Sequence, residues 1–526
     1  MSSSLTTISP ANSLGTDLIW WRAAPGQRAL VSVVWNPTSL FADSIHIEAR
    51  ISNAKGRVRA SWHQPLAVDQ PLLIDSHAHG EWQAAGPTEG LLALFACTEG
   101  KPSRDASELF HRFYPVVDWW EEGRHLGTLH SDQNVIHRDR QAVSGITEIV
   151  VREASNESNA LVILNGEVEQ AAAALSVQVK NSKGEFMSAV WDQAMRPFTV
   201  NCIPLSSLFD DIDGFCGEGQ LQVEAEFQSR GVFTRPYVKT TGAARGIFHG
   251  DNVATWGALH PVLHAMVGGE VNPIAVIQDA DTRTFINILH SHEGHELPVP
   301  NDVRLFDLEG ACVFECPAKI SALRKELVRI DVSALLPDAS QPFKGHISLN
   351  FSTAENLPVP LHLQALAEYR RADTVAHVMC WSDQFNSNIR MAKRDRQPNP
   401  TRWRSYFRLL ENAELVTEAW ITNSGHGGYR RSAKVEATLI LSDGESRTLE
   451  MEIAPFATRI LVLDNFASGG YPQDCDERMG MLWLESESDL AIMGFTRHLQ
   501  QPGIAAEHFM SLMSLNEGSL LAPAGS

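Results

Sequence analysis

The sequence predicts an all-β protein made of four tandem Ig-like antiparallel β-sandwich domains with little helix. Short segments alternate apolar and polar residues, as in IHIEARI at residues 45–51, which is the period of a half-buried strand. Polar turns ending in glycine separate such segments, because glycine tolerates the positive φ of tight hairpins. The same landmarks also return four times along the chain. Strand-like and helix-like segments do not alternate along the sequence, so it does not predict a parallel sheet.

Three landmarks define the repeat. The turn glycines are Gly56, Gly184, Gly310 and Gly444, at steps of 128, 126 and 134 residues. A strand end follows 19 to 21 residues later, at Asp75, Pro204, Asp331 and Asp464. A glycine opening another strand comes 14 to 16 residues after that, at Gly90, Gly219, Gly345 and Gly480. We therefore expect domains at 1–139, 140–256 and 257–389, and a linker plus a fourth domain at 390–526.

Helix is expected in two short places. Residues 331–338 begin with the N-cap residue Asp331 and end at Pro337. The C-terminal AAEHFMSLMSL, residues 505–515, is the second candidate. Asp210 and Asp211 are expected in an acidic loop.

Composition limits the function classes. The chain has 526 residues, a net charge of −20 and a pI near 5.4, which argues against nucleic acid and anionic membranes as partners. We expect no membrane span and no secretory leader. The seven cysteines are scattered, and Cys312 and Cys316 would lie roughly 13 Å apart on a strand, too far for a disulfide. A cytoplasmic location is expected.

A short motif recurs near the ends of the first three repeats. It reads HSDQNV from His130, HGDNVA from His249 and WSDQFN from Trp381, with its aspartates at Asp132, Asp251 and Asp383. The fourth repeat has HFMSLM at His508, without the aspartate. We interpret the motif as a junction element that fixes turns between domains. A ligand site is the alternative, but one histidine and one aspartate supply too few ligands for a closed metal site.

Two other clusters are candidate binding sites. His290, His292 and His295 crowd HSHEGHE, where they would bind a divalent metal if they do not form solvated loop surface. The segment 390–408 interleaves aromatic and basic residues, which is typical of binders of phosphate or single-stranded nucleic acid. A linker docked on acidic neighbours is the simpler interpretation. Its candidate anion-binding residues are Arg394, Arg396, Arg402 and Arg404.

Tryptophan pairs occur twice in the first repeat, at Trp20–Trp21 and Trp119–Trp120. Adjacent residues of a strand face opposite sides, so one indole of each pair is a candidate for exposure and for stacking on a sugar. Packing in a core or between domains is the favoured interpretation.

The last repeat, residues 414–516, carries an outside resemblance. Its landmarks are a strand ending in Asn423, a turn at Ser442–Asp443, Ile453-Ala454-Pro455 before a strand, Leu463-Asp464-Asn465 after it, and a late strand over Leu490 to Met493. This order resembles the small β-sandwich of sensory-rhodopsin-transducer-like proteins. The other repeats share it in outline. The resemblance implies a non-enzymatic, oligomer-forming sandwich that transmits or binds.

We therefore expect a non-enzymatic β-sandwich scaffold or binding protein without a cofactor, which assembles with a protein partner or with itself. Framework landmarks recur across the repeats, while no nucleophile, phosphate-loop or zinc-cysteine motif is present. Two alternatives remain open. One is a carbohydrate-binding protein that uses the tryptophan pairs of the first repeat. The other is a metal-dependent enzyme that uses the cluster His290–His295.

Overall fold

A computed structural model describes most of the chain. The described residues are 10, 13–33, 45–66, 71–77, 89–98, 115–131, 134–135, 143–233, 235–252, 269–270, 273–289, 299–322, 327–351, 364–381, 403–423, 431–441, 445–466, 477–486, 488, 490–500, 503–508 and 511–512. Their regular secondary structure is almost entirely β-strand. The fold is all-β, as the alternating pattern predicts, and its sheets are antiparallel.

The described chain divides into two compact units. The first unit runs to Asn252, and the second begins beyond it. Each unit contains two sets of eight strands, called modules 1 and 2 in the first unit and modules 3 and 4 in the second. The four domain boundaries expected from the repeats stay a prediction.

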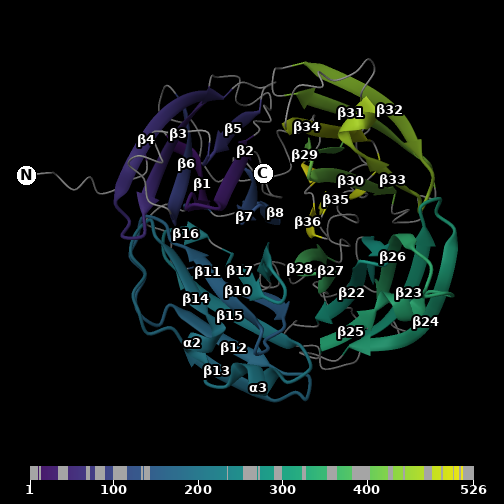
Figure 1. The fold of residues 1–526 in the computed structure, drawn as a ribbon, viewed down its shortest axis with the longest axis horizontal. Helices are drawn as coiled ribbons and strands as arrows, with labels where there is room; N and C mark the ends of the chain where they lie inside the picture. The colour runs from purple at the N-terminus through teal and green to yellow at the C-terminus, as the bar shows by residue number, and fades with distance from the viewer. Residues whose placement is uncertain are drawn as a thin grey trace, which may run out of the picture. The chain divides into compact units, whose positions relative to one another are not determined.

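The first unit is coloured purple to teal in Figure 1. Module 1 comprises β1 (Ser13–Arg22), β2 (Gln27–Val33), β3 (Ile45–Asn53), β4 (Val58–Leu66), β5 (Leu72–Asp75), β6 (Glu89–Thr98), β7 (Val116–Glu121) and β8 (Arg124–His130). Module 2 comprises β10 (Val143–Val151), β11 (Glu157–Leu164), β12 (Leu175–Lys180), β13 (Phe186–Val190), β14 (Val200–Pro204), β15 (Leu221–Ser229), β17 (Tyr237–Gly242) and β18 (Gly246–His249).

The second unit is coloured green to yellow in Figure 1. Module 3 comprises β21 (Ile274–Gln278), β22 (Thr282–Leu289), β23 (Val299–Asp307), β24 (Cys312–Ala322), β25 (Leu327–Asp331), β26 (Phe343–Phe351), β27 (Gln364–Arg371) and β28 (Thr374–Trp381). Module 4 comprises β29 (Trp403–Asn412), β30 (Leu415–Asn423), β31 (Ala433–Leu441), β32 (Ser446–Ile453), β33 (Thr458–Leu461), β34 (Glu477–Ser486), β35 (Leu490–His498) and β36 (Ile504–His508).

All four modules repeat one strand order. In each module the first, sixth, third and fourth strands lie side by side, and the fifth, second, seventh and eighth do the same. The first strand pairs antiparallel with the sixth in every module. In module 4 the two halves join into one sheet through a bridge between β29 and β30. The three sequence landmarks therefore mark equivalent points of one repeated topology.

Short extra strands follow the eighth strands. After β8 comes β9 (Asn134–Val135), which pairs with β16 (Val232–Phe233). After β18 comes β19 (Asp251–Asn252), which pairs with β10. After β36 comes β37 (Ser511–Leu512), which pairs with β29. The remaining short strand, β20 (Gly269–Glu270), pairs with β26.

The apolar cores do not stop at module borders within a unit. Buried residues of modules 1 and 2 form one continuous cluster. In the second unit, one cluster combines module 3 with Trp420, Met493 and Phe495 of module 4, and a further cluster fills the rest of module 4. Burial of apolar surface is the main stabilising contribution to such cores.

The turn glycines adopt the expected conformation. Gly56, Gly184 and Gly310 have φ of 71°, 82° and 88°, and each N–H donates to the carbonyl three residues earlier. This left-handed region favours glycine because it has no Cβ. Gly444 lies outside the described residues.

The glycines of the third landmark are required for a different reason, which is steric. A Cβ on Gly90 would lie 2.0 Å from the Ser52 carbonyl oxygen, and one on Gly345 would lie 2.0 Å from the Phe306 carbonyl oxygen. Ser52 and Phe306 belong to the third strands, which pair with the sixth strands carrying these glycines. In modules 1 and 3 the landmark therefore marks a close approach of two backbones.

The helix predictions have mixed outcomes. Residues Val332–Leu335 form a 3-10 helix, and the Asp331 side chain accepts from the Ser333 N–H as a cap. The predicted C-terminal helix is wrong, because residues 504–508 form β36 beside β35 and residues 511–512 form β37. Asp210 and Asp211 lie in a turn, as expected, and this turn connects two short helices that were not predicted, α2 (Leu205–Leu208) and α3 (Ile212–Cys216).

Six cysteines lie among the described residues, and all six are free thiols. Cys312 and Cys316 lie on β24 and pair with different residues of β23, as expected for a strand. Among the described helices, none has the length and apolar character needed to cross a bilayer.

Candidate functional site

The first residues of two junction motifs meet in the first unit. His130 ends β8 and His249 ends β18, and these strands are neighbours. The two imidazole centroids are 5.1 Å apart, with their planes at 87°. Both side chains are buried, with 8% and 5% of their surface exposed. The His249 Nδ1 lies 2.9 Å from the Gly250 carbonyl oxygen.

The serine of the first motif anchors the end of β8. The Ser131 N–H donates to the Pro115 carbonyl at 2.8 Å. Its hydroxyl hydrogen-bonds to the Asp17 carboxylate and lies 3.0 Å from the Leu18 carbonyl, both on β1. Ser131 and Asp17 are fully buried. These contacts fix the backbone directly after His130.

The other motif residues differ from copy to copy. Asp251 lies in strand β19, where its backbone pairs with Glu148, and not in the turn expected for it. A Cβ on Gly250 would lie 2.6 Å from the Glu148 carbonyl oxygen, so this copy needs glycine for close packing. Trp381 ends β28 and pairs with Gln364. Asp132 and Asp383 lie outside the described residues.

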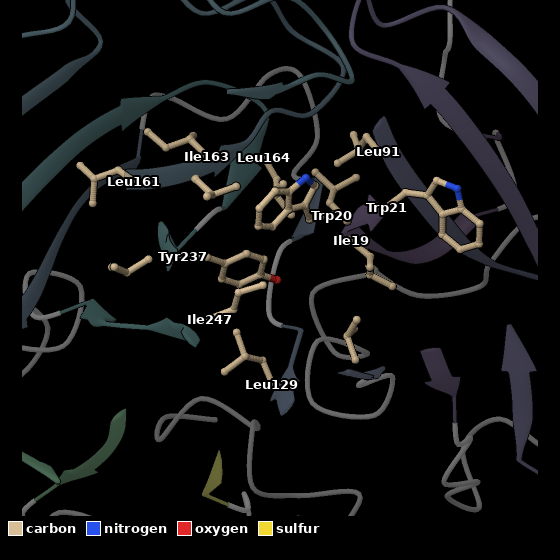
Figure 2. Packing of buried hydrophobic residues seen from close by; sticks show 14 of the residues in the cluster. Ile19, Trp20, Trp21, Leu91, Leu129, Leu161, Ile163, Leu164, Tyr237 and Ile247 are labelled. Carbon is tan, nitrogen blue, oxygen red and sulfur yellow. The ribbon is translucent and has the colours of Figure 1, made fainter. Parts of the chain in front are cut away.

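The four tryptophans are buried, which supports the packing interpretation and removes the exposed indole that sugar stacking requires. Trp20, Trp21, Trp119 and Trp120 are 1%, 1%, 0% and 7% exposed. Trp20 and Trp21 do point in different directions from β1 (Figure 2), but apolar residues cover both sides of the strand. The Trp20 indole N–H donates to Glu89 at 2.8 Å, and that of Trp119 donates to the Trp20 carbonyl at 2.9 Å.

The remaining predicted sites are mostly outside the described residues. This holds for His290, His292 and His295, and for Arg394, Arg396 and Arg402. Arg404 lies on β29, where its backbone pairs with Glu485 and Leu512. The metal and anion hypotheses for these residues stay predictions.

A buried polar cluster that the sequence interpretation missed lies on β7 and β8. The His125 Nε2 is 2.8 Å from Asp118 Oδ1, and the Thr128 hydroxyl donates to the same oxygen at 2.6 Å. Thr128 Oγ1 also lies 3.3 Å from the same His125 Nε2. In a hydrolytic triad the acid and the hydroxyl contact opposite ring nitrogens, so this geometry does not match one.

The second unit also has a buried acid and a buried histidine on neighbouring strands, as Asp118 and His125 are in the first unit. Glu368 on β27 is fully buried, and Arg329 binds its two oxygens at 2.6 and 2.9 Å. Arg370 pairs with the same carboxylate, and His377 lies opposite on β28. Burial raises the pKa of Glu368, but the hydrogen bond from Arg329 and the charges of His377, Arg329 and Arg370 hold it well below its usual range. Bidentate pairing of this kind is strong and directional.

A third feature is strand β13, at the edge of the first sheet of module 2. Phe186 is 69% exposed and Val190 is 55% exposed. Among the large hydrophobic residues of the described chain, they have the largest and the third-largest exposures. The alternate residues Met187 and Ala189 pack against the core. The strand thus presents an apolar outer face at an open edge.

Comparison with known proteins leaves the family open: no protein-family model matches the chain, and no curated protein matches it. The resemblance of the last repeat to sensory-rhodopsin-transducer-like proteins therefore stays a prediction.

Proposed function

We propose that the chain is a non-enzymatic scaffold that assembles with a second copy of itself through strand β13. The observation that carries this proposal is the composition of β13 relative to its three equivalents. The fourth strand lies at a sheet edge in every module, as β4, β13, β24 and β32. Open edges pair with other chains unless charges, proline or bulges block them.

Three of the four edge strands carry such blocks. Strand β4 contains Arg59 and Pro65, and β24 contains Glu315, Pro317 and Lys319. Strand β32 contains Arg447, Glu450 and Glu452. Strand β13 reads FMSAV and contains neither a charge nor a proline. It is the edge among these four that accepts another strand at the lowest cost.

No described strand pairs with the outer side of β13, where its backbone offers hydrogen-bonding groups to another chain. The Trp191 N–H donates to Leu175 and the Glu185 carbonyl accepts from Asn181, so these two residues face β12. Successive residues of a strand direct their backbone groups to opposite sides. The N–H and C=O groups of Phe186, Ser188 and Val190 therefore point away from β12 and toward the open edge.

The sequence of β13 is suited to pairing with itself. An antiparallel pair centred on Ser188 places Phe186 opposite Val190 of the second copy, on both sides of a two-fold axis. Aromatic and β-branched residues facing each other across strands stabilise a pair by about 0.2–1 kcal/mol. Pairing would also cover the two most exposed apolar side chains of this strand.

Overall charge works against assembly. Two chains of net charge −20 repel each other, and salt screens that repulsion. We therefore expect β13 pairing to strengthen with ionic strength, unlike contacts formed by opposite charges. The scattered free thiols support a cytoplasmic location for this assembly.

Sedimentation velocity of the full chain over a range of concentrations tests the proposal. We expect a monomer–dimer equilibrium that shifts to dimer with added salt, and that Ser188→Lys abolishes. Thr448→Lys is the matched control, because Thr448 is an exposed residue of the equivalent strand β32. A chain that stays monomeric at all concentrations, or a dimer insensitive to Ser188→Lys, contradicts the proposal.

A further inference from the structure

The paired histidines of the first unit have the geometry of metal ligands. Each offers a ring nitrogen, and these ligand atoms lie within 4.8 Å of one another. Two imidazole nitrogens bound to one tetrahedral zinc at about 2.0–2.1 Å lie roughly 3.3 Å apart. The two strand ends therefore hold the nitrogens close to the separation that one ion requires.

The tautomer of His249 is set by its backbone contact. A carbonyl oxygen only accepts hydrogen bonds, so the His249 Nδ1 at 2.9 Å from the Gly250 oxygen carries the proton. With the proton on Nδ1, the lone pair of the neutral ring is on Nε2, the atom through which an imidazole in this tautomer coordinates an ion. Metal-bound histidines usually donate their other ring N–H to a carbonyl or carboxylate in this way. This contact therefore fixes the ring in the tautomer that a ligand at Nε2 requires.

The surroundings favour a held ion over a solvated one. Both imidazoles are nearly buried, and Ser131 fixes the chain directly after His130 through Asp17 and Leu18. His130 comes from module 1 and His249 from module 2. An ion bound by both would link the two modules of the first unit.

We propose that the first unit binds one divalent transition-metal ion between His130 and the Nε2 of His249. Neutral imidazole suits zinc, nickel and copper among the available divalent ions. The remaining coordination positions are left to water or to another donor. The ion stabilises the contact between modules 1 and 2, and this role is separate from assembly through β13.

Calorimetric titration of the metal-free full chain with Zn²⁺ and Ni²⁺ tests the proposal. We expect one ion per chain, and at least a tenfold loss of affinity in both His130→Gln and His249→Gln. The matched control is His63→Gln, because His63 is exposed on β4 and forms another close pair, with 5.8 Å between its ring centroid and that of His46 on β3. Unchanged affinity in the first two variants, or an equal loss in His63→Gln, overturns the proposal.

A second measurement needs no variant. Copper bound to the wild-type chain, with ascorbate as reductant and dissolved oxygen as oxidant, oxidises side chains next to the ion. We expect peptide mass spectrometry to find oxidation concentrated at His130 and His249. Oxidation at exposed histidines such as His63, with these two spared, overturns the proposal. Zinc should also raise the unfolding temperature of the wild-type chain, but not that of His249→Gln.

Discussion

Tyr237 of β17 meets Trp119 of β7 edge to face, with 5.6 Å between the ring centroids, and so joins the cores of modules 1 and 2. The second unit has an equivalent contact, between Tyr369 of module 3 and Phe495 of module 4 at 5.0 Å. Both tyrosines lie on the seventh strand of their module, Tyr237 on β17 and Tyr369 on β27. A repeated tyrosine thus serves the same role in both units.

Removing the Tyr237 ring should destabilise the first unit as a whole. Tyr237 is 1% exposed, and truncating a large buried aromatic residue to alanine costs about 3–5 kcal/mol. We expect Tyr237→Ala to lower the free energy of unfolding in urea by that amount. Leu499→Ala, at a residue 59% exposed, is the control and should change it by less than about 0.5 kcal/mol. A near-neutral Tyr237→Ala would show that the modules do not depend on this contact.

Gly90→Ala tests the close approach of β6 and β3. The added Cβ would lie 2.0 Å from the Ser52 oxygen, so the two strands must separate, at a cost of about 1–3 kcal/mol. Gly123→Ala is the control, because Gly123 has open space around it and a φ of 76°. The control should lose only about 1 kcal/mol from the unfavourable φ. Thermal unfolding compares the two, and equal shifts would contradict the packing explanation.

Glu153 should make the first unit less stable as pH rises. Burial raises the pKa of Glu153 to about 7, although hydrogen bonds from Asn159 oppose the shift. The unfolded chain releases this proton near pH 4.3, so stability falls between about pH 4 and pH 7. We expect Glu153→Gln, which resembles the protonated form, to gain on the order of 1–2 kcal/mol at pH 8 and little at pH 4.

Urea unfolding at several pH values measures this dependence. Glu169→Gln removes one negative charge at an exposed position and is the control. A Glu153→Gln variant whose stability runs parallel to that of the wild type at every pH would refute the assignment.

His377 should make the second unit less stable in acid. Burial lowers the pKa of His377 to about 4; the charge of Glu368 opposes this shift, and the charges of Arg370 and Arg329 add to it. The unfolded chain takes up the proton near pH 6.5, so the stability present above pH 6.5 is lost as pH falls toward 4. His377→Gln should flatten this part of the profile, by roughly 2–3 kcal/mol at pH 4. The exposed His63→Gln serves as control, and equal slopes in both variants would contradict the prediction.

Much of the fold could be predicted because its signals are local. The alternation of apolar and polar residues predicted the strands, and the turn glycines predicted equivalent hairpins in modules 1, 2 and 3. The predicted C-terminal helix is wrong because its structure depends on a contact that is not local. Residues 504–508 form a strand because they pair with β35. Such pairing overrides the weak preference of a short segment.

The sites depended on contacts that no local pattern contains. His130 and His249 are 119 residues apart in sequence, and only the pairing of module 1 with module 2 brings their rings together. The tryptophan pairs suggested exposure because a lone sandwich has an outer face, but within the first unit Trp20 and Trp119 are covered by residues of both modules. The acid within VVDWW was a usable signal for the Asp118 cluster, since a charge inside an apolar strand needs a buried partner.

Photo-crosslinking from the centre of β13 tests the central claim most directly. A benzophenone side chain in place of Ser188 reacts only with groups in contact with it, and Thr448 substituted in the same way gives the control. On illumination we predict a covalent dimer whose crosslinks map to residues 186–190 of the second copy. No dimer product, or crosslinks that map elsewhere, would contradict assembly through this strand.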